Sequence, residues 1–142
     1  MNVANSIPVT IISGYLGAGK TTLVNNALRK ANGLKLAILV NEFGNLAIDE
    51  DLIISQDENM ISLAGGCICC SYGNDMLLSL KELTSLDSKP DHIILEASGV
   101  AIPSSIERSI SLIDDCYTES IVSIVDSEQI QDQLSNKYVS DT

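Results

Sequence analysis

The stretch that most constrains the fold is GYLGAGKT at residues 14–21, which fits the pattern G-x-x-x-x-G-K-[ST]. It stands between an apolar run at residues 8–13 and a helix-like run at residues 21–31. In that setting the backbone N–H groups and the helix N-terminus point at one anionic ligand. The motif therefore predicts a polyphosphate site and a P-loop nucleotide-binding fold. A chance glycine-rich turn is the alternative, and the flanking elements argue against it.

Three parts of this motif have separate chemical roles. Gly14, Gly17 and Gly19 let the backbone bend so that its N–H groups face inward. Lys20 can reach the β- and γ-phosphates, and Thr21 can offer its hydroxyl to Mg²⁺.

Short apolar runs alternate with helix-like runs along the rest of the chain. The expected strands are residues 8–13, 34–40, 60–64, 92–98 and 120–126, and the expected helices are residues 21–31, 73–86, a segment from Pro103, and a short helix or turn at 127–134. In the first helix, Leu23, Val24, Ala27, Leu28 and Ala31 share one apolar face. This order favours an α/β fold with a mostly parallel sheet and helices on both faces. We expect one domain over residues 1–142, incomplete at its C-terminus because the sequence stops soon after a strand.

Two further segments should reach the same edge of the sheet as the phosphate loop. Glu96 ends the strand HIILE and would hold Mg²⁺ directly or through water, although an ordinary acidic strand end is the alternative. Gly99 can place its N–H near a γ-phosphate. In VNEFG, Glu42 begins a loop that runs to Asp49 and Glu50, and this loop is predicted to be a switch that senses the γ-phosphate. Asn41 and Phe43 are interpreted as a turn residue and an anchor.

A cluster of thiols follows two glycines in GGCICC, at Cys67, Cys69 and Cys70. Thiolates at this spacing suit Zn²⁺ or Cu(I), with Co²⁺ and Ni²⁺ also possible. Three sulfurs leave a tetrahedral site one ligand short, which favours transient holding, and Glu42, a water or a partner residue could complete it. A redox pair and small apolar filler at a strand end are the alternatives. Cys116 and the single histidine, His92, are interpreted as structural: a lone semi-buried thiol and a hydrogen-bonded imidazole.

Charge and the amino-terminal sequence limit the partners. With 8 Lys and Arg against 19 Asp and Glu, the net charge is −11, which disfavours nucleic acid and anionic membrane surfaces. The first residues show no signal peptide and no apolar run long enough to span a bilayer. We therefore expect a cytoplasmic, reducing location, where four cysteines indicate metal or redox chemistry before disulfides.

Taken in order, GYLGAGKTT, NEFG with a downstream ID, GGCICCS and LEASG resemble the CobW-like GTPases, metal-handling relatives of the nickel-insertion GTPases of hydrogenase and urease maturation. The likeness covers residues 7 to about 126. It implies a SIMIBI-type P-loop fold, GTP and Mg²⁺ binding, slow GTP hydrolysis, and metal held at the Cys-x-Cys-Cys motif.

The resemblance also assigns residues to roles. Lys20, Glu42, Asp49 and Glu96 would be catalytic, with Glu96 the acid of the third GTPase motif and Glu42 or Asp49 ordering the attacking water. By matching positions, Gly17, Gly19, Lys20, Thr21 and Thr22 would bind phosphate and Mg²⁺. With Gly14, Ala18 and Gly99 they make up the expected nucleotide ligands. Thr21 and Glu96 would hold Mg²⁺, and Cys67, Cys69 and Cys70 the cargo metal.

Two departures from the family pattern matter. Family members often carry an acid directly after NEFG, where this chain has Asn45. The guanine-reading Asn-Lys-x-Asp motif is missing, because NKYV at residues 136–139 ends in Val139. Guanine specificity therefore rests on the resemblance.

Three functions are compatible with these features. The favoured one is a GTP-driven metallochaperone that transfers Zn²⁺ or Co²⁺ to a client metalloprotein, with a homodimer as a candidate assembly. A metal storage or sensor module without productive hydrolysis is the main alternative. A P-loop kinase would need a substrate lid with arginines, and Arg29 and Arg108 are the only two arginines in the sequence.

Overall fold

The computed structural model describes residues 6–41, 47–56, 60–72, 75–99 and 101–135. One seven-stranded sheet runs through it in the order β3-β4-β5-β2-β6-β1-β7. The strands are β1 (Ile7–Gly14), β2 (Leu36–Val40), β3 (Ile53–Gln56), β4 (Met60–Leu63), β5 (Ile68–Ser71), β6 (His92–Glu96) and β7 (Cys116–Ile124). The helices are α1 (Lys20–Arg29), α2 (Met76–Thr84), α3 (Pro103–Ile110) and α4 (Ile130–Ser135), with short 3₁₀ turns at Glu50–Leu52 and Ala64–Gly66.

The sheet is mostly parallel, as expected. Strands β5, β2, β6, β1 and β7 pair in parallel. Strand β4 pairs antiparallel with β5, and β3 pairs antiparallel with β4. The expected strands at 8–13, 34–40, 60–64, 92–98 and 120–126 are all present, although β7 begins four residues earlier than predicted. Strands β3 and β5 were not predicted.

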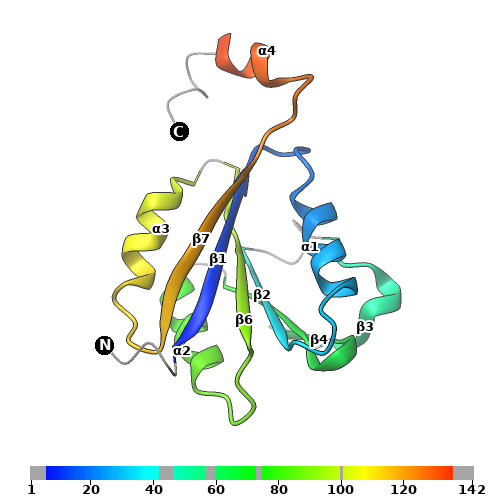
Figure 1. Ribbon diagram of the computed structural model, residues 1–142, viewed down its shortest axis with the longest axis vertical. Coiled ribbons are helices and arrows are strands. Elements are labelled where there is room, and N and C mark those ends of the chain that lie inside the picture. Colours follow the sequence, from blue (N-terminus) through cyan, green and yellow to red (C-terminus); the bar gives the residue numbers. More distant parts are fainter. Residues whose placement is uncertain (1–5, 42–46, 57–59, 73–74, 100, 136–142) are drawn as a thin grey trace.

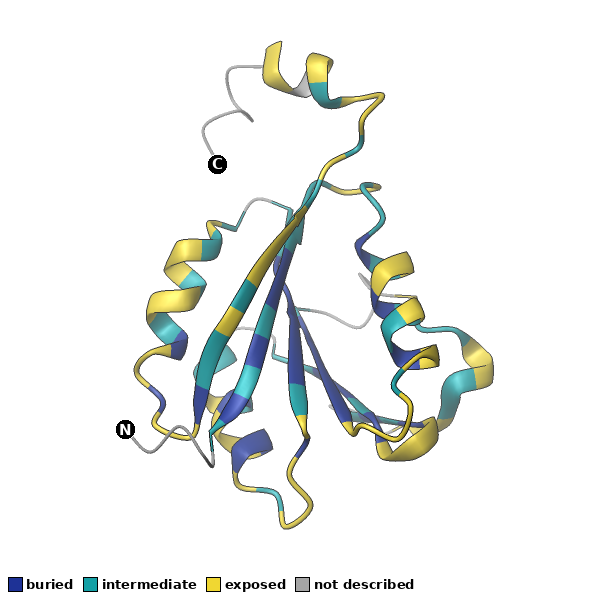
Figure 2. Cartoon of the chain, in the orientation of Figure 1, coloured by how far each residue is buried: buried dark blue, intermediate teal, exposed yellow. Residues whose placement is uncertain are grey.

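Helices cover both faces of the sheet, which confirms the predicted layering (Figure 1). On one face, Val24 and Leu28 of α1 belong to a buried cluster with Ile12, Ile38 and Ile94. On the other face, α2 and α3 contribute Leu80, Leu83 and Ile110 to a cluster with Ile11 and Leu95. Figure 2 shows β2 and much of β1 and β6 buried between these layers.

The ends of α1 and α2 differ from the predicted ones. Helix α1 ends at Arg29, and Asn32 and Gly33 then take positive φ angles of 51° and 91°, which α-helix excludes. Leu23 is 39% exposed and does not belong to the core, so its predicted place on the apolar face is wrong. Helix α2 begins at Met76 because the Asp75 side chain accepts a hydrogen bond from the Leu78 N–H at 2.9 Å, a standard N-cap.

Parallel pairing brings the carboxyl ends of β1, β6, β2 and β5 to one edge of the sheet. Ile12 pairs with Glu96, and Val40 pairs with Ser71. The loops that follow these residues therefore start side by side, as in other open α/β sheets that bind ligands at this edge. Among the helices in the described ranges, none combines the length and the apolar character needed to cross a membrane.

Candidate functional site

The glycine-rich loop leaves β1 through a backbone position that only glycine tolerates. Gly14 has a φ of +140°, and a Cβ added there would lie 2.5 Å from the Ile124 carbonyl oxygen of β7. At the other end of the loop, Gly19 is the N-cap of α1 and has a left-handed conformation, with φ 107°. These two glycines fix the path of the loop across the ends of β1 and β7.

The first turn of α1 faces the space inside this loop. Gly19 has no side chain that could cap the helix, and the Leu23 N–H is bonded to the Gly19 carbonyl at 3.0 Å. In an α-helix the N–H groups that precede this first bond have no acceptor within the helix. Together with the positive end of the helix dipole, they suit the negative oxygens of a polyphosphate.

Lys20 and Glu96 form a buried pair of opposite charge beside these donors. The Lys20 Nζ donates to the carbonyls of Gly14 at 2.7 Å and Tyr15 at 3.1 Å, and it lies 4.0 Å from the Glu96 Oε1. Both side chains are only 8% exposed. Burial raises the pKa of the Glu96 carboxyl, and the charge of Lys20 opposes that shift. The loop thus holds an ammonium group in place next to a carboxylate at the end of β6.

A cavity of about 340 Å³ opens over this pair. That volume lies within the range of small-molecule sites. Seven of the predicted site residues line it: Gly17, Gly19, Lys20, Thr21, Thr22, Glu96 and Gly99. The structure therefore brings most of the predicted nucleotide ligands together.

The remaining predicted loop residues, Gly14 and Ala18, line a neighbouring cavity of about 170 Å³ with Ser123 and Asp126 from the end of β7 and the segment after it. Sequence reasoning missed Asn41 and Ser98 as lining residues of the larger cavity. Asn41 directly follows β2, and Ser98 lies two residues after the end of β6. This position after a parallel strand is the sequence signal that could have identified them.

The predicted switch residues have different outcomes. Glu42 lies outside the described residues. The Asp49 carboxylate accepts hydrogen bonds from the Arg29 Nε at 3.0 Å and Nη2 at 2.8 Å, at the end of α1 opposite to Lys20. Arg29 also binds Asp51, and this hydrogen bond lowers the pKa of the Asp51 carboxyl. Asp49 is thus held on α1 and does not line the 340 Å³ cavity.

The three clustered thiols lie in and next to β5, where the structure separates them. Cys67 precedes the strand, and its Sγ accepts from the Leu36 N–H at 3.3 Å, near the start of β2 and away from the phosphate loop. Cys69 belongs with Cys67 to the buried cluster on the α1 side, whereas Cys70 belongs to the cluster on the α2 side. Adjacent residues of a strand point to opposite faces, so β5 cannot direct both side chains at one point.

Consistent with this separation, no group of three or more His, Cys, Asp or Glu side chains in the described ranges is arranged to hold a metal ion. Burial raises the pKa of the Cys69 thiol to about 12 and that of Cys70 to about 11. A metal ion bound by either sulfur would have to displace a proton.

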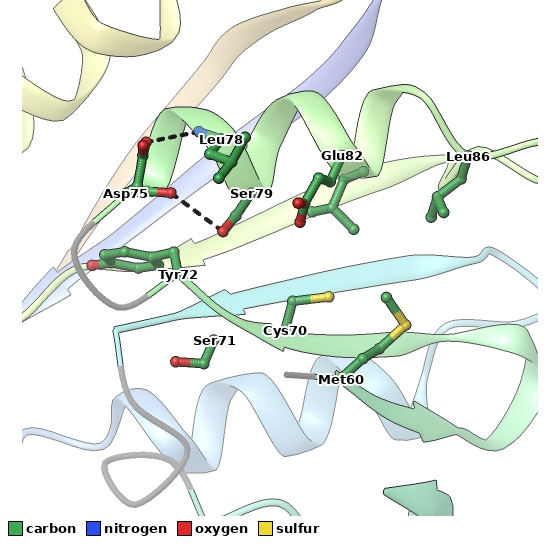
Figure 3. A pocket seen from close by; sticks show the side chains of 10 residues that line it. Met60, Cys70, Ser71, Tyr72, Asp75, Leu78, Ser79, Glu82 and Leu86 are labelled. Carbon is green, nitrogen blue, oxygen red and sulfur yellow. Dashed lines mark hydrogen bonds between the residues drawn. The ribbon is translucent and has the colours of Figure 1, made fainter. Parts of the chain in front are cut away.

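Cys70 lines a second cavity of about 300 Å³ between β4, β5 and α2 (Figure 3). Met60 and Glu82 border the same hollow, and Figure 3 shows Glu82 extending from α2 toward β5. Ser71 and Tyr72, which directly follow the thiol motif, line it as well. This cavity is the space through which the Cys70 thiol can be approached.

His92 and Cys116 have the structural roles predicted for them. The Thr10 Oγ1 lies 2.9 Å from the His92 Nε2, and burial lowers the pKa of the imidazole. Cys116 is 5% exposed within the core, where burial raises the pKa of its thiol to about 11. All four cysteines are free thiols.

Comparison with known proteins finds a matching family and several relatives of this chain. Residues 8–141 match the family described as CobW/HypB/UreG, nucleotide-binding domain. The zinc chaperone CobW of Sinorhizobium sp is 35% identical over 133 residues, covering 87% of this chain and 38% of that protein. The zinc chaperone YjiA of Escherichia coli (strain K12) is 33% identical over 139 residues, covering 92% and 44%. A crystal structure of a Zn(II)-bound triple mutant of YjiA GTPase has a TM-score of 0.75 at 28% identity, covering 96% and 45%. The chain thus spans less than half the length of the relatives it matches.

Proposed function

This chain belongs to the CobW/HypB/UreG family of nucleotide-binding domains, and from that membership we propose that it binds and hydrolyses GTP as part of a zinc-handling metallochaperone. One observation carries the nucleotide part of the proposal. The buried Lys20 ammonium faces a 340 Å³ cavity beside the uncapped N-terminus of α1. This arrangement is suited to a polyphosphate.

Within this proposal, Lys20 binds the β- and γ-phosphates, and the loop from Gly14 to Thr22 surrounds them with N–H donors. Thr21 and Glu96 line the same cavity and supply the hydroxyl and carboxylate oxygens that Mg²⁺ prefers. When bound there, Mg²⁺ would neutralise negative charge on the phosphate oxygens. The preference for guanine rests on the relative that is named a GTPase.

Two further residues are proposed for water ordering. Glu42 directly follows Asn41 in the chain, and Asp49 comes seven residues after Glu42. For Asp49 to order water, it would have to release Arg29, which holds its carboxylate at 2.8 Å. Glu42 is proposed as the other candidate for that role.

The cargo is proposed to be Zn²⁺, because the relatives are zinc chaperones, with Co²⁺ as a second candidate. Cys67, Cys69 and Cys70 are proposed as its ligands. Since Cys69 and Cys70 lie on opposite faces of β5, joint ligation requires the end of this strand to change conformation. Nucleotide state would control that change, and the metal would then pass to a client metalloprotein. Free thiols at all four cysteines fit a reducing cytoplasm.

The nucleotide site is tested by a Lys20→Ala variant of the full chain, with Lys30→Ala as a matched control at the C-cap of the same helix. We expect Lys20→Ala to slow GTP hydrolysis roughly 100-fold, the usual effect of removing one donor that stabilises a transition state. The Lys30→Ala variant should keep the original rate. Normal GTP hydrolysis by Lys20→Ala would refute the proposed site.

A second experiment separates the chaperone from the storage or sensor alternative. Zn²⁺ is titrated against a competing chromophore in the presence of GDP or a non-hydrolysable GTP analogue. A chaperone driven by GTP must bind Zn²⁺ with different affinities in the two nucleotide states. Equal affinities would favour storage or sensing.

A further inference from the structure

We propose that Ser71 and Tyr72 are positioning residues that couple the nucleotide cavity to the thiol-bearing strand β5. The inference rests on the proposed function, because it names the contacts through which nucleotide state would reach the metal ligands. Ser71 directly follows Cys70 in the chain and Tyr72 follows Ser71, so no loop separates them from the thiols. Their hydrogen bonds lead to residues that line the nucleotide cavity.

Ser71 is the last residue of β5 and makes the first of these connections. It pairs with Val40 in the parallel ladder between β2 and β5. Its Oγ donates to the Asn41 carbonyl at 2.9 Å, which extends the attachment one residue beyond the ladder. Asn41 itself lines the 340 Å³ cavity. A displacement of Asn41 on phosphate binding would therefore act directly on the end of β5.

Tyr72 makes two more connections at the same edge. Its N–H donates to the Val40 carbonyl at 2.7 Å. Its phenol donates to the backbone carbonyl of Glu96 at 3.5 Å, a long and therefore weak bond. Glu96 lines the nucleotide cavity, so Tyr72 links β5 to the backbone of the residue that carries the proposed Mg²⁺ carboxylate, as well as to β2.

The same two residues border the cavity that contains Cys70 (Figure 3). Ser71 and Tyr72 thus line the cavity beside Cys70. Their hydrogen-bond partners, Asn41 and Glu96, line the nucleotide cavity. Because Cys69 and Cys70 must change their relative orientation to share an ion, the attachment of the strand end decides whether they can do so. The geometry therefore makes the Ser71 hydroxyl the contact whose removal should weaken coupling most.

The test measures a coupling factor: the ratio of Zn²⁺ affinities with a non-hydrolysable GTP analogue and with GDP, obtained by chromophore competition on the full chain. Ser71→Ala removes the bond to Asn41. Ser79→Ala is the matched control, because Ser79 lines the same thiol cavity but its Oγ donates to the Asp75 carbonyl within the α2 region. Ser71→Thr keeps a hydroxyl in a strand position and serves as the rescue.

We expect Ser71→Ala to reduce the logarithm of the coupling factor by at least half. Ser79→Ala and Ser71→Thr should keep the original coupling factor. Tyr72→Phe should lower it less, because only the 3.5 Å bond is lost. Linkage requires Zn²⁺ to change the ratio of the affinities for the GTP analogue and for GDP by the same factor, which gives an independent readout. A change in folding alone would lower the Zn²⁺ affinity equally in the two nucleotide states and leave the coupling factor unchanged.

The two possible failures differ. If the unmodified chain has a coupling factor different from 1 and Ser71→Ala retains it, the assignment of Ser71 is wrong while the proposed function stands. If the unmodified chain binds both Zn²⁺ and nucleotide with a coupling factor of 1, the nucleotide-driven function and this inference are both overturned.

Discussion

At the scale of single residues, Lys20 and Glu96 show what a motif can and cannot specify. Their residue types and their place at the ends of β1 and β6 follow from the sequence. Their partners do not, because the carbonyls of Gly14 and Tyr15 that bind the Lys20 Nζ carry no sequence signal. These bonds matter, since a buried charge without partners is strongly destabilising. The backbone of the loop thus stabilises the Lys20 ammonium group.

Gly14 gives a stability prediction at this scale. A Gly14→Ala variant should lose roughly 2–4 kcal/mol of unfolding free energy, because the backbone at φ +140° is strained for alanine and its Cβ would meet the Ile124 carbonyl at 2.5 Å. Gly33→Ala is the control: its φ is +91°, but a Cβ there meets nothing within 4 Å. It should lose only about 1–2 kcal/mol. Urea unfolding of both variants measures the difference, and equal losses would contradict the role of the close approach.

His92 gives a prediction of pH dependence. Burial lowers the pKa of its imidazole below the ordinary 6.5, and Glu119, 3.8 Å away, only partly opposes that shift. Below pH 6.5 the unfolded chain therefore takes up this proton more readily than the folded chain, so the contribution of His92 to stability is lost as pH falls through the folded pKa. Since the chain has one histidine, a single imidazole signal in an NMR titration reports this pKa. A value of 6.5 or above would refute the prediction.

At the scale of elements, the thiol strand marks the limit of sequence reasoning. Strands β1, β2 and β6 were predictable because each is a run of apolar residues long enough to stand out. The four residues of β5, ICCS, contain two of the clustered thiols, and this pattern predicts a metal site rather than a strand. Once Cys69 and Cys70 are placed in a strand, alternation puts them on opposite faces. Strand β3 was missed for a related reason: three of its four residues are exposed, so it has no buried pattern.

The segment at residues 47–51 is attached to α1, and this attachment can be tested. Arg29 binds Asp49 and Asp51, and the Asn25 Nδ2 donates to the Ala47 carbonyl at 3.0 Å. An Arg29→Gln variant should speed backbone hydrogen exchange at residues 49–52, where the Leu52 N–H is bonded to the Asp49 carbonyl at 2.9 Å. Arg108→Gln makes the same change of charge on α3 and should leave this exchange unaltered. Unchanged exchange in Arg29→Gln would show that the contacts of Arg29 do not hold the segment.

At the scale of the whole molecule, the mostly parallel sheet was predictable and its antiparallel end was not. Alternating strands and helices indicate parallel crossovers, and β2, β6, β1 and β7 pair in parallel as this pattern predicts. Strands β3, β4 and β5 follow one another with short connections and no α-helix in the described ranges between them, which permits antiparallel pairing. This part of the chain carries the thiols, so the least predictable region of the sheet is also the one proposed to bind metal.

The net charge of −11 gives the prediction at the largest scale. With 19 acidic against 8 basic side chains, repulsion among carboxylates disfavours the compact state, and salt screens that repulsion. Raising NaCl from 0.05 to 0.5 M, on the order of a tenfold change in ionic strength, should therefore raise Tm by roughly 2–4 °C. Salt also weakens the favourable contact of Arg29 with Asp49 and Asp51. Arg29→Gln, which lacks this contact and removes one positive charge, should gain more from salt than the unmodified chain. A Tm that falls with NaCl in both proteins would mean that local ion pairs outweigh the repulsion of the molecule as a whole.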